Sequence, residues 1–305
     1  MLREKTRVAV VGFGNVGRYA IDAVQTAPDM ELAGVVRRAS SLNSNNDTLQ
    51  TLGVHAVSDI RELENVQAAI LCTPTRTIPD VAESILSLGI NTVDSFDIHG
   101  QPILALRARL QAAAQENNAV AIVSAGWDPG TDSVVRTLFE AMAPFGITYT
   151  NFGPGMSMGH STVVRTMPGV KEALSMTIPL GTGVHRRMVY VELEPDSSYE
   201  QVEQQILTDP YFAKDETHVH AVSDVGALWD LGHAVMMQRK GTSGKTANQM
   251  MQLHMAINNP ALTGQILVAA ARAGLRQNPG AYCLPEIAPL DFLPGDRESL
   301  IERLV

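Results

Sequence analysis

Several kinds of residue are scarce in this sequence, and each shortage argues against a class of protein. Its two cysteines, Cys72 and Cys283, are too few for a disulfide framework or a cysteine-based zinc site, and we interpret both as structural. No apolar run approaches the ~20 residues that a membrane span needs, and no apolar signal segment lies near the start. With 23 Lys and Arg against 32 Asp and Glu, neither a nucleic acid nor an anionic membrane is expected as a partner. We therefore expect a soluble globular protein of the cytoplasm.

The first motif is a glycine triplet with G-x-G-x-x-G spacing, Gly12, Gly14 and Gly17, which directly follows the apolar run at residues 8–11. A helical pattern comes next, so the segment indicates a strand, a tight turn and a helix. In such a turn the first glycine permits the bend, the second lets the backbone approach a pyrophosphate, and the third lets helix and strand pack. The pattern predicts a dinucleotide-binding turn at the helix N-terminus.

A second apolar run, residues 32–36, ends where a residue that contacts the cofactor ribose should lie, ~20 residues beyond the glycines. Arg37 and Arg38 occupy this position. An acidic residue there would bind the 2′-hydroxyl of NAD, whereas a guanidinium pairs with a 2′-phosphate. The cofactor is therefore predicted to be NADP.

The first part of the chain continues as alternating strands and helices. Strands are expected at residues 68–72, 91–94 and 120–123, with helices near 78–88 and 101–118 and a loop at 39–46. Thr73, Pro74 and Thr75 follow a strand at its carboxyl end, where open α/β sheets bind ligands. The residues predicted to bind the cofactor are Gly12, Gly14, Asn15, Val16, Gly17, Arg37, Arg38, Cys72, Thr73, Pro74 and Thr75.

The pattern changes in the second part of the chain. Apolar, β-branched segments at 174–178, 188–193, 217–222 and 250–257 surround one clear helix at 199–207, and the glycines between Gly153 and Gly183 are spread as in a binding loop. Asn259 and Pro260 then begin an alanine-rich helix that we expect to return to the first domain.

The 305 residues favour two domains. We predict an α/β fold, a doubly wound parallel sheet of the Rossmann type with a second α+β domain built on a mostly antiparallel sheet. Residues 1–123 with 261–305 would form the NADP-binding domain, and residues 124–260 the substrate-binding and dimerisation domain.

Longer motifs are more specific than the glycine triplet. Residues 124–130 read Ser-Ala-Gly-Trp-Asp-Pro-Gly, and residues 152–161 read Phe-Gly-Pro-Gly-Met-Ser-Met-Gly-His-Ser. Together with the opening glycine motif, Val-Asp-Ser at 93–95 and Asn-Asn-Pro at 258–260, they resemble the meso-diaminopimelate D-dehydrogenase family over the length of the chain.

The resemblance implies reversible, NADP-dependent oxidative deamination at the D-centre of meso-2,6-diaminopimelate. The products are L-2-amino-6-oxopimelate, ammonia and NADPH, and reductive amination of other 2-keto acids to D-amino acids would be the reverse type of reaction. It also implies a homodimer that takes part in lysine biosynthesis.

The resemblance further assigns residues position by position. Asp94, Trp127 and Asp128 match the surroundings of the D-centre, and Gly155 and Met156 match the loop over its carboxylate. The distal L-centre is matched by Thr177, Arg187, His233 and Asn259. Phe152 stands where the family often has tryptophan, and the segment between Pro179 and His185 is short, which indicates the compact branch of the family.

Simpler interpretations remain for some of these residues. Asp128 could cap a helix beside a core Trp127, His233 could be a buried strand histidine, and Arg187 could be solvated. Asp97 and His99 lack a third ligand at suitable spacing, so we expect no metal. Asp94 and Asp128 are the candidates for proton transfer, because a carboxyl group in a closed pocket can have its pKa raised.

Two alternative functions stay open on the sequence. One is another NADP-dependent two-domain oxidoreductase of the aspartate and lysine pathway, which would not release ammonia. The other is a non-catalytic NADP(H)-binding sensor, which would need no carboxylate pair in its pocket.

Overall fold

The computed structural model describes residues 5–42, 49, 53–228 and 233–305. Its contacts divide the chain into two units, Met1–Thr137 with Pro260–Val305, and Leu138–Asn259. The boundary expected after residue 123 falls earlier than this division, because the N–H groups of Ser124 and Ala125 donate to the side chain and the carbonyl of Asp94 in the first unit. Helix α6 (Thr131–Met142) runs across the division. Among the described residues, no helix combines the length and the apolar character needed to cross a membrane.

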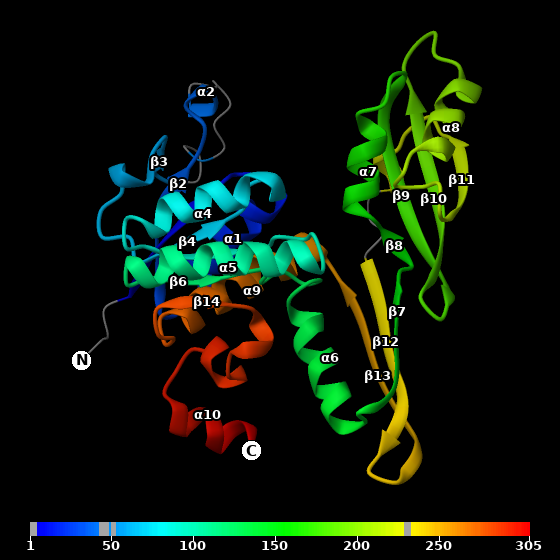
Figure 1. Cartoon of the computed structure of the whole chain (residues 1–305). Helices are drawn as coiled ribbons and strands as arrows, with labels where there is room; N and C mark the ends of the chain where they lie inside the picture. The colour runs from blue at the N-terminus through cyan, green and yellow to red at the C-terminus, as the bar shows by residue number, and fades with distance from the viewer. Residues whose placement is uncertain (1–4, 43–48, 50–52, 229–232) are drawn as a thin grey trace. The chain divides into compact units, whose positions relative to one another are not determined.

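The first unit is built on one parallel sheet of seven strands in the order β14-β6-β5-β4-β1-β2-β3 (Figure 1). Because β2 and β4 lie on opposite sides of β1, the direction of strand succession reverses there, which is where ligands bind in open α/β sheets. The strands are β1 (Thr6–Val11), β2 (Met30–Val36), β3 (Ala56–Val57), β4 (Ala68–Leu71), β5 (Asn91–Asp94), β6 (Val120–Ile122) and β14 (Gly280–Tyr282).

Both faces of this sheet are covered by helices. Val8 and Val10 of β1 join one core cluster with residues of α1 and α9, whereas Ala9 and Val11 join the other with residues of α4 and α5. This alternation along a strand buried on both faces is what a doubly wound sheet requires. The helices are α1 (Asn15–Thr26), α2 (Ala39–Leu42), α4 (Ile78–Leu86), α5 (Gln101–Glu116), α9 (Asn259–Gly274) and α10 (Arg297–Leu304).

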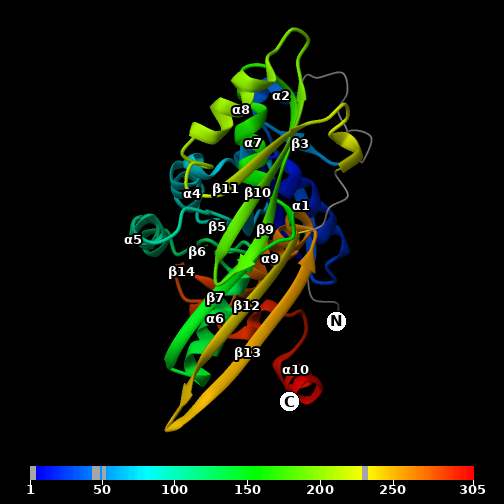
Figure 2. The same cartoon turned by 90° about the vertical axis from the view of Figure 1, so that its right-hand side faces the viewer.

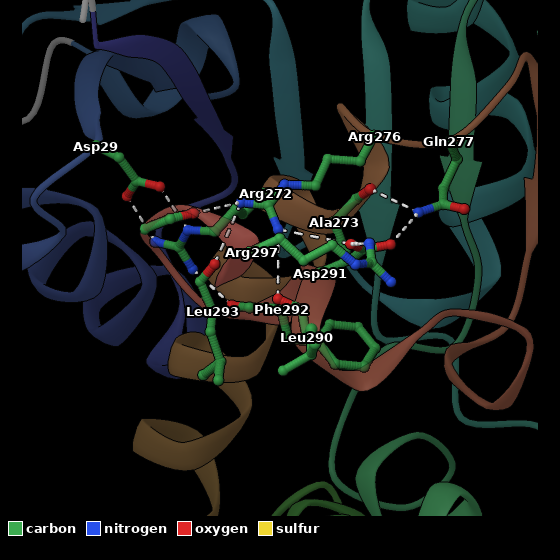
Figure 3. A network of polar contacts seen from close by, with 11 residues as sticks. Asp29, Arg272, Ala273, Arg276, Gln277, Leu290, Asp291, Phe292, Leu293 and Arg297 are labelled. Carbon is green, nitrogen blue, oxygen red and sulfur yellow. Dashed lines mark hydrogen bonds and ion pairs between the residues drawn. The ribbon is translucent and has the colours of Figure 1, made fainter. Parts of the chain in front are cut away.

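The C-terminal segment belongs to this unit. A Cβ on Gly264 of α9 would lie 2.7 Å from the backbone nitrogen of Ala20, so glycine lets α9 pack closely on α1. Arg272 of α9 donates to both oxygens of Asp29 at 2.6 and 2.7 Å, and to the carbonyl of Phe292 (Figure 3). These contacts connect the last elements of the chain to the start of β2.

The second unit contains two smaller sheets, in the orders β11-β10-β9-β8 and β13-β12-β7 (Figure 2). All its strand pairs are antiparallel except β10 with β11, which is parallel. The strands are β7 (Phe145–Phe152), β8 (Gly155–Met156), β9 (Val170–Gly181), β10 (Val184–Leu193), β11 (Glu216–Ala221), β12 (His233–Ser243) and β13 (Thr246–Ile257), with helices α7 (Met158–Arg165) and α8 (Tyr199–Thr208). The predicted fold class is confirmed by this combination of a parallel sheet with an α+β unit.

The predictions of two loops were partly wrong. The segment from Gly153 to Gly183 contains α7 and the strands β8 and β9, because Val163 and Val164 pack against the core of the second unit. Residues 39–42 form α2, and residues 43–46 of the same predicted loop lie outside the described part of the chain.

Candidate functional site

A cavity of about 850 Å³ lies beside the turn between β1 and α1. Gly12 has a φ of +101°, and a Cβ there would lie 2.5 Å from the carbonyl oxygen of Cys72. A Cβ on Gly17 would lie 2.3 Å from the carbonyl oxygen of Gly12, whereas nothing lies within 4 Å of one built on Gly14. Gly12 and Gly17 therefore allow the close backbone contacts of the turn, and the space beside Gly14 is open. Gly14 caps α1 without a side-chain hydrogen bond, so the helix N-terminus can receive an anion.

The two arginines after β2 also line the cavity. Arg37 is held by its backbone N–H, which donates to the carbonyl of Val57 at 2.9 Å. Its guanidinium carbon lies 5.2 Å from the ring centre of Phe13, and that of Arg18 lies 5.1 Å from the same ring. Phe13 thus gives Arg37 a cation–π contact at the rim of the cavity.

The cavity contains most of the residues predicted to bind the cofactor. Gly12, Gly14, Asn15, Val16, Arg37, Arg38, Cys72, Thr73 and Pro74 line it. Gly17 packs under the turn, and Thr75 donates to Asp97 at 2.6 Å instead. The lining residues that the sequence did not predict are Val11, Phe13, Val36, Ser41, Ser58, Thr77 and Val81. Ser58 follows the two-residue strand β3, which is too short to give a period, but Phe13 lies inside the glycine motif and could have been found there.

Neither thiol is poised for chemistry. Burial raises the pKa of the Cys72 thiol to about 12, and burial together with Glu286 raises that of Cys283 to about 11. Both are therefore protonated at neutral pH, which fits the structural role predicted for them. Within the described part of the chain, no three His, Cys, Asp and Glu side chains are grouped so as to hold a metal ion.

Asp94 ends strand β5 and is completely buried. Its Oδ1 accepts hydrogen bonds from the backbone N–H groups of Phe96 and Ser124, both at 2.9 Å. Burial nevertheless raises the pKa of this carboxyl to about 6, since desolvation outweighs the two hydrogen bonds. Asp94 joins the end of β5 to residues 124–130, so it stands next to the turn that carries Trp127 and Asp128.

Asp128 has a side chain only 17% exposed, and its Oδ1 lies 3.9 Å from Nε2 of His99. Burial and then the neighbouring Asp132 raise the pKa of its carboxyl to about 7. Among the described residues, no backbone N–H donates to this carboxylate, as it would to a helix cap. Trp127 is 3% exposed, and its carbonyl accepts from the N–H of Asp132 at 3.0 Å. A buried carboxyl that titrates near neutrality is suited to proton transfer.

In the second unit, three predicted residues form a row across the four-stranded sheet. Gly155 of β8 pairs with Thr177 of β9, which pairs with Arg187 of β10. The Arg187 guanidinium donates from Nη1 to the Thr177 hydroxyl and from Nε to Oδ2 of Asp215 at 2.6 Å. Arg187 is therefore not the solvated surface residue that the sequence also allowed, since only 13% of its side chain is exposed.

The other predicted residues of this unit lie around the same sheet or at the ends of strands. Met156 pairs with Met176, and the backbone N–H of Phe152 donates to Nε2 of His185 at 2.8 Å. The backbone of His233 pairs with Ile257, while its side chain lies outside the described residues. Asn259 begins α9 after β13.

His160 and Asp215 were not among the predicted site residues. His160 lies on α7, with Nδ1 2.8 Å from the Ser157 hydroxyl and Nε2 3.1 Å from the carbonyl of Tyr211. Burial and the charge of Arg187 lower its pKa to about 4, so it is neutral at pH 7. The sequence signal for His160 was its place inside the motif at 152–161, whereas Asp215 lies in no motif.

Comparisons with known proteins give a family match in each part of the chain. The diaminopimelic acid dehydrogenase C-terminal domain family matches residues 126–184, and the oxidoreductase family with an NAD-binding Rossmann fold matches residues 6–124. A meso-diaminopimelate D-dehydrogenase of Bacteroides fragilis is 57% identical over 302 residues, which cover 99% of this chain and 100% of that protein. The corresponding protein of Lysinibacillus sphaericus is 34% identical, over 88% of this chain and 89% of that protein.

A solved structure gives the same result. The diaminopimelate dehydrogenase of C. glutamicum, in complex with DAP, superposes with a TM-score of 0.87 and 28% identity, and the match covers all of both chains. Both sequence relatives share the name meso-diaminopimelate D-dehydrogenase and match this chain over most of its length. By these relationships the chain is an amino-acid dehydrogenase, and it belongs to the meso-diaminopimelate D-dehydrogenase family.

Proposed function

We propose that this protein catalyses the reversible, NADP-dependent oxidative deamination of meso-2,6-diaminopimelate at its D-centre. The products are L-2-amino-6-oxopimelate, ammonia and NADPH, and the reverse reaction type is reductive amination of 2-keto acids. The observation that carries the proposal is the 57% identity, over 99% of the chain, to the dehydrogenase of B. fragilis. That relation also disfavours the non-catalytic sensor and the reductases that release no ammonia.

The residues of the first unit fit NADP. The open side of Gly14 and the N-terminus of α1 would receive the pyrophosphate, and Arg37 and Arg38 would pair with the 2′-phosphate. The bound nicotinamide supplies the hydride acceptor. The chain supplies the cavity and the orientation of the cofactor.

Two carboxyl groups are proposed to handle protons and the substrate amine. Asp128, with its pKa of about 7, can accept a proton at neutral pH and return it in the reverse direction. Asp94 supports it from the end of β5, where one carboxylate oxygen already accepts two backbone N–H groups. Trp127, Gly155 and Met156 complete the proposed D-centre group, with Phe152 in place of the more usual tryptophan.

The distal L-centre would be bound by Thr177, Arg187, His233 and Asn259. Arg187 is suited to this role because its side chain is largely buried and, in the part of the chain that the structure describes, some of its N–H groups have no acceptor. Thr177 is 2% exposed and lies directly across from it. A diamino dicarboxylate needs such donors at its far end.

We also propose a homodimer that works in the cytoplasm. One face of the three-stranded sheet exposes Ile147, Lys240 and Met250 in one row, with Phe145 73% exposed next to them. Exposed apolar side chains gathered on one sheet face favour contact with a second copy. The free thiols of Cys72 and Cys283 fit a reducing compartment.

The first prediction concerns the cofactor. Parent protein should prefer NADP over NAD by ~10-fold or more in kcat/KM, because two guanidinium contacts to a phosphate remain favourable even when partly exposed. Replacing Arg37 and Arg38 together with alanine should remove the preference. Arg18→Ala is the control, since Arg18 also contacts Phe13 but lies on α1. Equal efficiency of the parent with both cofactors would refute the assignment.

The second prediction concerns Asp128. Asp128→Asn should preserve folding and cofactor binding but lower turnover ~100-fold or more, because an amide cannot accept a proton. The kcat/KM of the parent in deamination should rise as pH increases through about 7, because its pH profile reports the free enzyme, and the variant should lose this inflection. Asp132→Asn should move the inflection to lower pH, since the charge of Asp132 raises the pKa of Asp128. Near-normal turnover in Asp128→Asn would mean that the carboxylate is structural.

The third prediction separates the two ends of the substrate. Arg187→Met should raise KM for diaminopimelate ~30-fold or more, because a substrate carboxylate is left unpaired. A short D-amino acid has no distal carboxylate and should be handled about as well as by the parent. Arg186→Met is the matched control, since Arg186 pairs with the exposed Glu216 on the same strands. Equal losses on both substrates would place Arg187 in the fold or at the reacting centre.

The fourth prediction concerns assembly. Sedimentation equilibrium should give twice the mass of one chain, and Met250→Lys should shift the protein towards the monomer by placing a charge in the apolar face. Thr246→Lys, at the first residue of the same strand, controls for added charge. A parent that sediments as a single chain at micromolar concentration would contradict the dimer.

A further inference from the structure

The row of residues across the four-stranded sheet extends beyond Arg187. Arg187 pairs with Thr177 of β9 on one side and with Thr217 of β11 on the other. Asp215 stands just ahead of β11, and its Oδ2 accepts from Arg187 Nε at 2.6 Å. The guanidinium is thus held from both neighbouring strands.

These contacts leave a defined part of the guanidinium available. Of its five N–H groups, Asp215 takes the one on Nε and Thr177 takes one on Nη1, so within the described part of the chain one on Nη1 and both on Nη2 remain. A carboxylate can bind two parallel N–H groups of a guanidinium edge. The N–H groups that remain on Nη1 and Nη2 can therefore donate to a substrate carboxylate.

Asp215 is itself fixed by the turn that carries it. Its backbone N–H donates to the carbonyl of Phe212 at 3.0 Å, and its own carbonyl accepts from the Thr217 hydroxyl at 3.2 Å. Phe212 is 1% exposed and packs in the core of the second unit. The turn therefore gives Asp215 a rigid base.

Two histidines near Arg187 do not add positive charge. Burial and the charge of Arg187 lower the pKa of both His160 and His185 below the usual value. Both are therefore uncharged at neutral pH. A substrate carboxylate beside Thr177 would therefore depend on the charge and the orientation of the Arg187 guanidinium.

We propose that Asp215 is a positioning residue that holds Arg187 ready to bind the distal carboxylate of the substrate. This inference rests on the proposed function. By fixing the Nε edge before substrate arrives, Asp215 lowers the entropy lost when a long, flexible arginine side chain is ordered. It acts through Arg187 and does not touch the reacting carbon.

The test compares Asp215→Asn with Glu216→Gln, its neighbour in sequence, which pairs with the exposed Arg186. Three substrates are used: meso-diaminopimelate, D-2-aminopimelate, which keeps the distal carboxylate without the distal ammonium, and D-alanine, which has neither. Asp215→Asn should raise KM ~10-fold for the first two, with kcat within about 2-fold, and leave D-alanine unchanged. Glu216→Gln should leave all three values within about 2-fold.

A double variant makes the test specific. In the Arg187→Met background, Asp215→Asn should add no further loss on meso-diaminopimelate, because its effect passes through the guanidinium. Unfolding temperatures of all variants show whether the fold is kept, and Asp215→Glu, which keeps the charge, should restore part of the affinity. If Asp215 were only structural, its replacement would lower the unfolding temperature and the rates with all three substrates together.

Three results would overturn the inference. An unchanged KM for meso-diaminopimelate in Asp215→Asn, with normal turnover by the parent, would refute it and leave the proposed function intact. A loss confined to meso-diaminopimelate and absent with D-2-aminopimelate would make Asp215 a ligand of the distal ammonium instead. No turnover of meso-diaminopimelate by the parent would refute the proposed function and the inference with it.

Discussion

The first unit depends on a close backbone contact between the β1–α1 turn and the end of β4. Only glycine fits at Gly12, because its φ is +101° and a Cβ would lie 2.5 Å from the carbonyl oxygen of Cys72. The same turn receives the backbone of α1 at Gly17. The turn thus lies where strand order reverses, between β1 and β4, and the cavity opens beside it. Burial of Cys72 is a consequence of this packing, and it makes the thiol inert while its residue lines the cavity.

Burial raises the pKa of two aspartates, Asp94 at the end of β5 and Asp128 in the turn that follows β6, but their hydrogen bonds differ. Asp94 satisfies one oxygen with two backbone N–H groups and thereby connects β5 to the turn at residues 124–130. Asp128 lacks such donors among the described residues and has Asp132 as a neighbour, so its pKa rises further, to about 7. The more strongly hydrogen-bonded carboxylate is suited to holding the turn, and the less satisfied one to exchanging a proton.

The sequence predicted the fold class well because its evidence is local. The glycine triplet, the arginines after β2 and the apolar runs each lie within a few residues, and Arg37 and Arg38 line the cavity beside the glycine turn. Helix α7 was missed because its glycine and serine resemble a loop, whereas its stability comes from Val163 and Val164 packing on a distant core. Asp215 could not be found, since it meets Arg187 only after β11 pairs alongside β10.

Arg186 and Arg187 are adjacent on β10, but strand geometry gives their side chains different surroundings. Arg186 and Arg187 point to opposite faces, as successive strand residues do, and each pairs with an acidic residue at or next to the start of β11. The side chain of Arg186 is 38% exposed, and that of Arg187 is 13% exposed. Water weakens the pair of Arg186 with Glu216. The charge of Arg187 is largely buried, so it depends on its hydrogen bonds to Asp215 and Thr177. Two neighbouring residues of the same type thus differ in role because the pleat places one on the solvent face and the other in the row with Gly155 and Thr177.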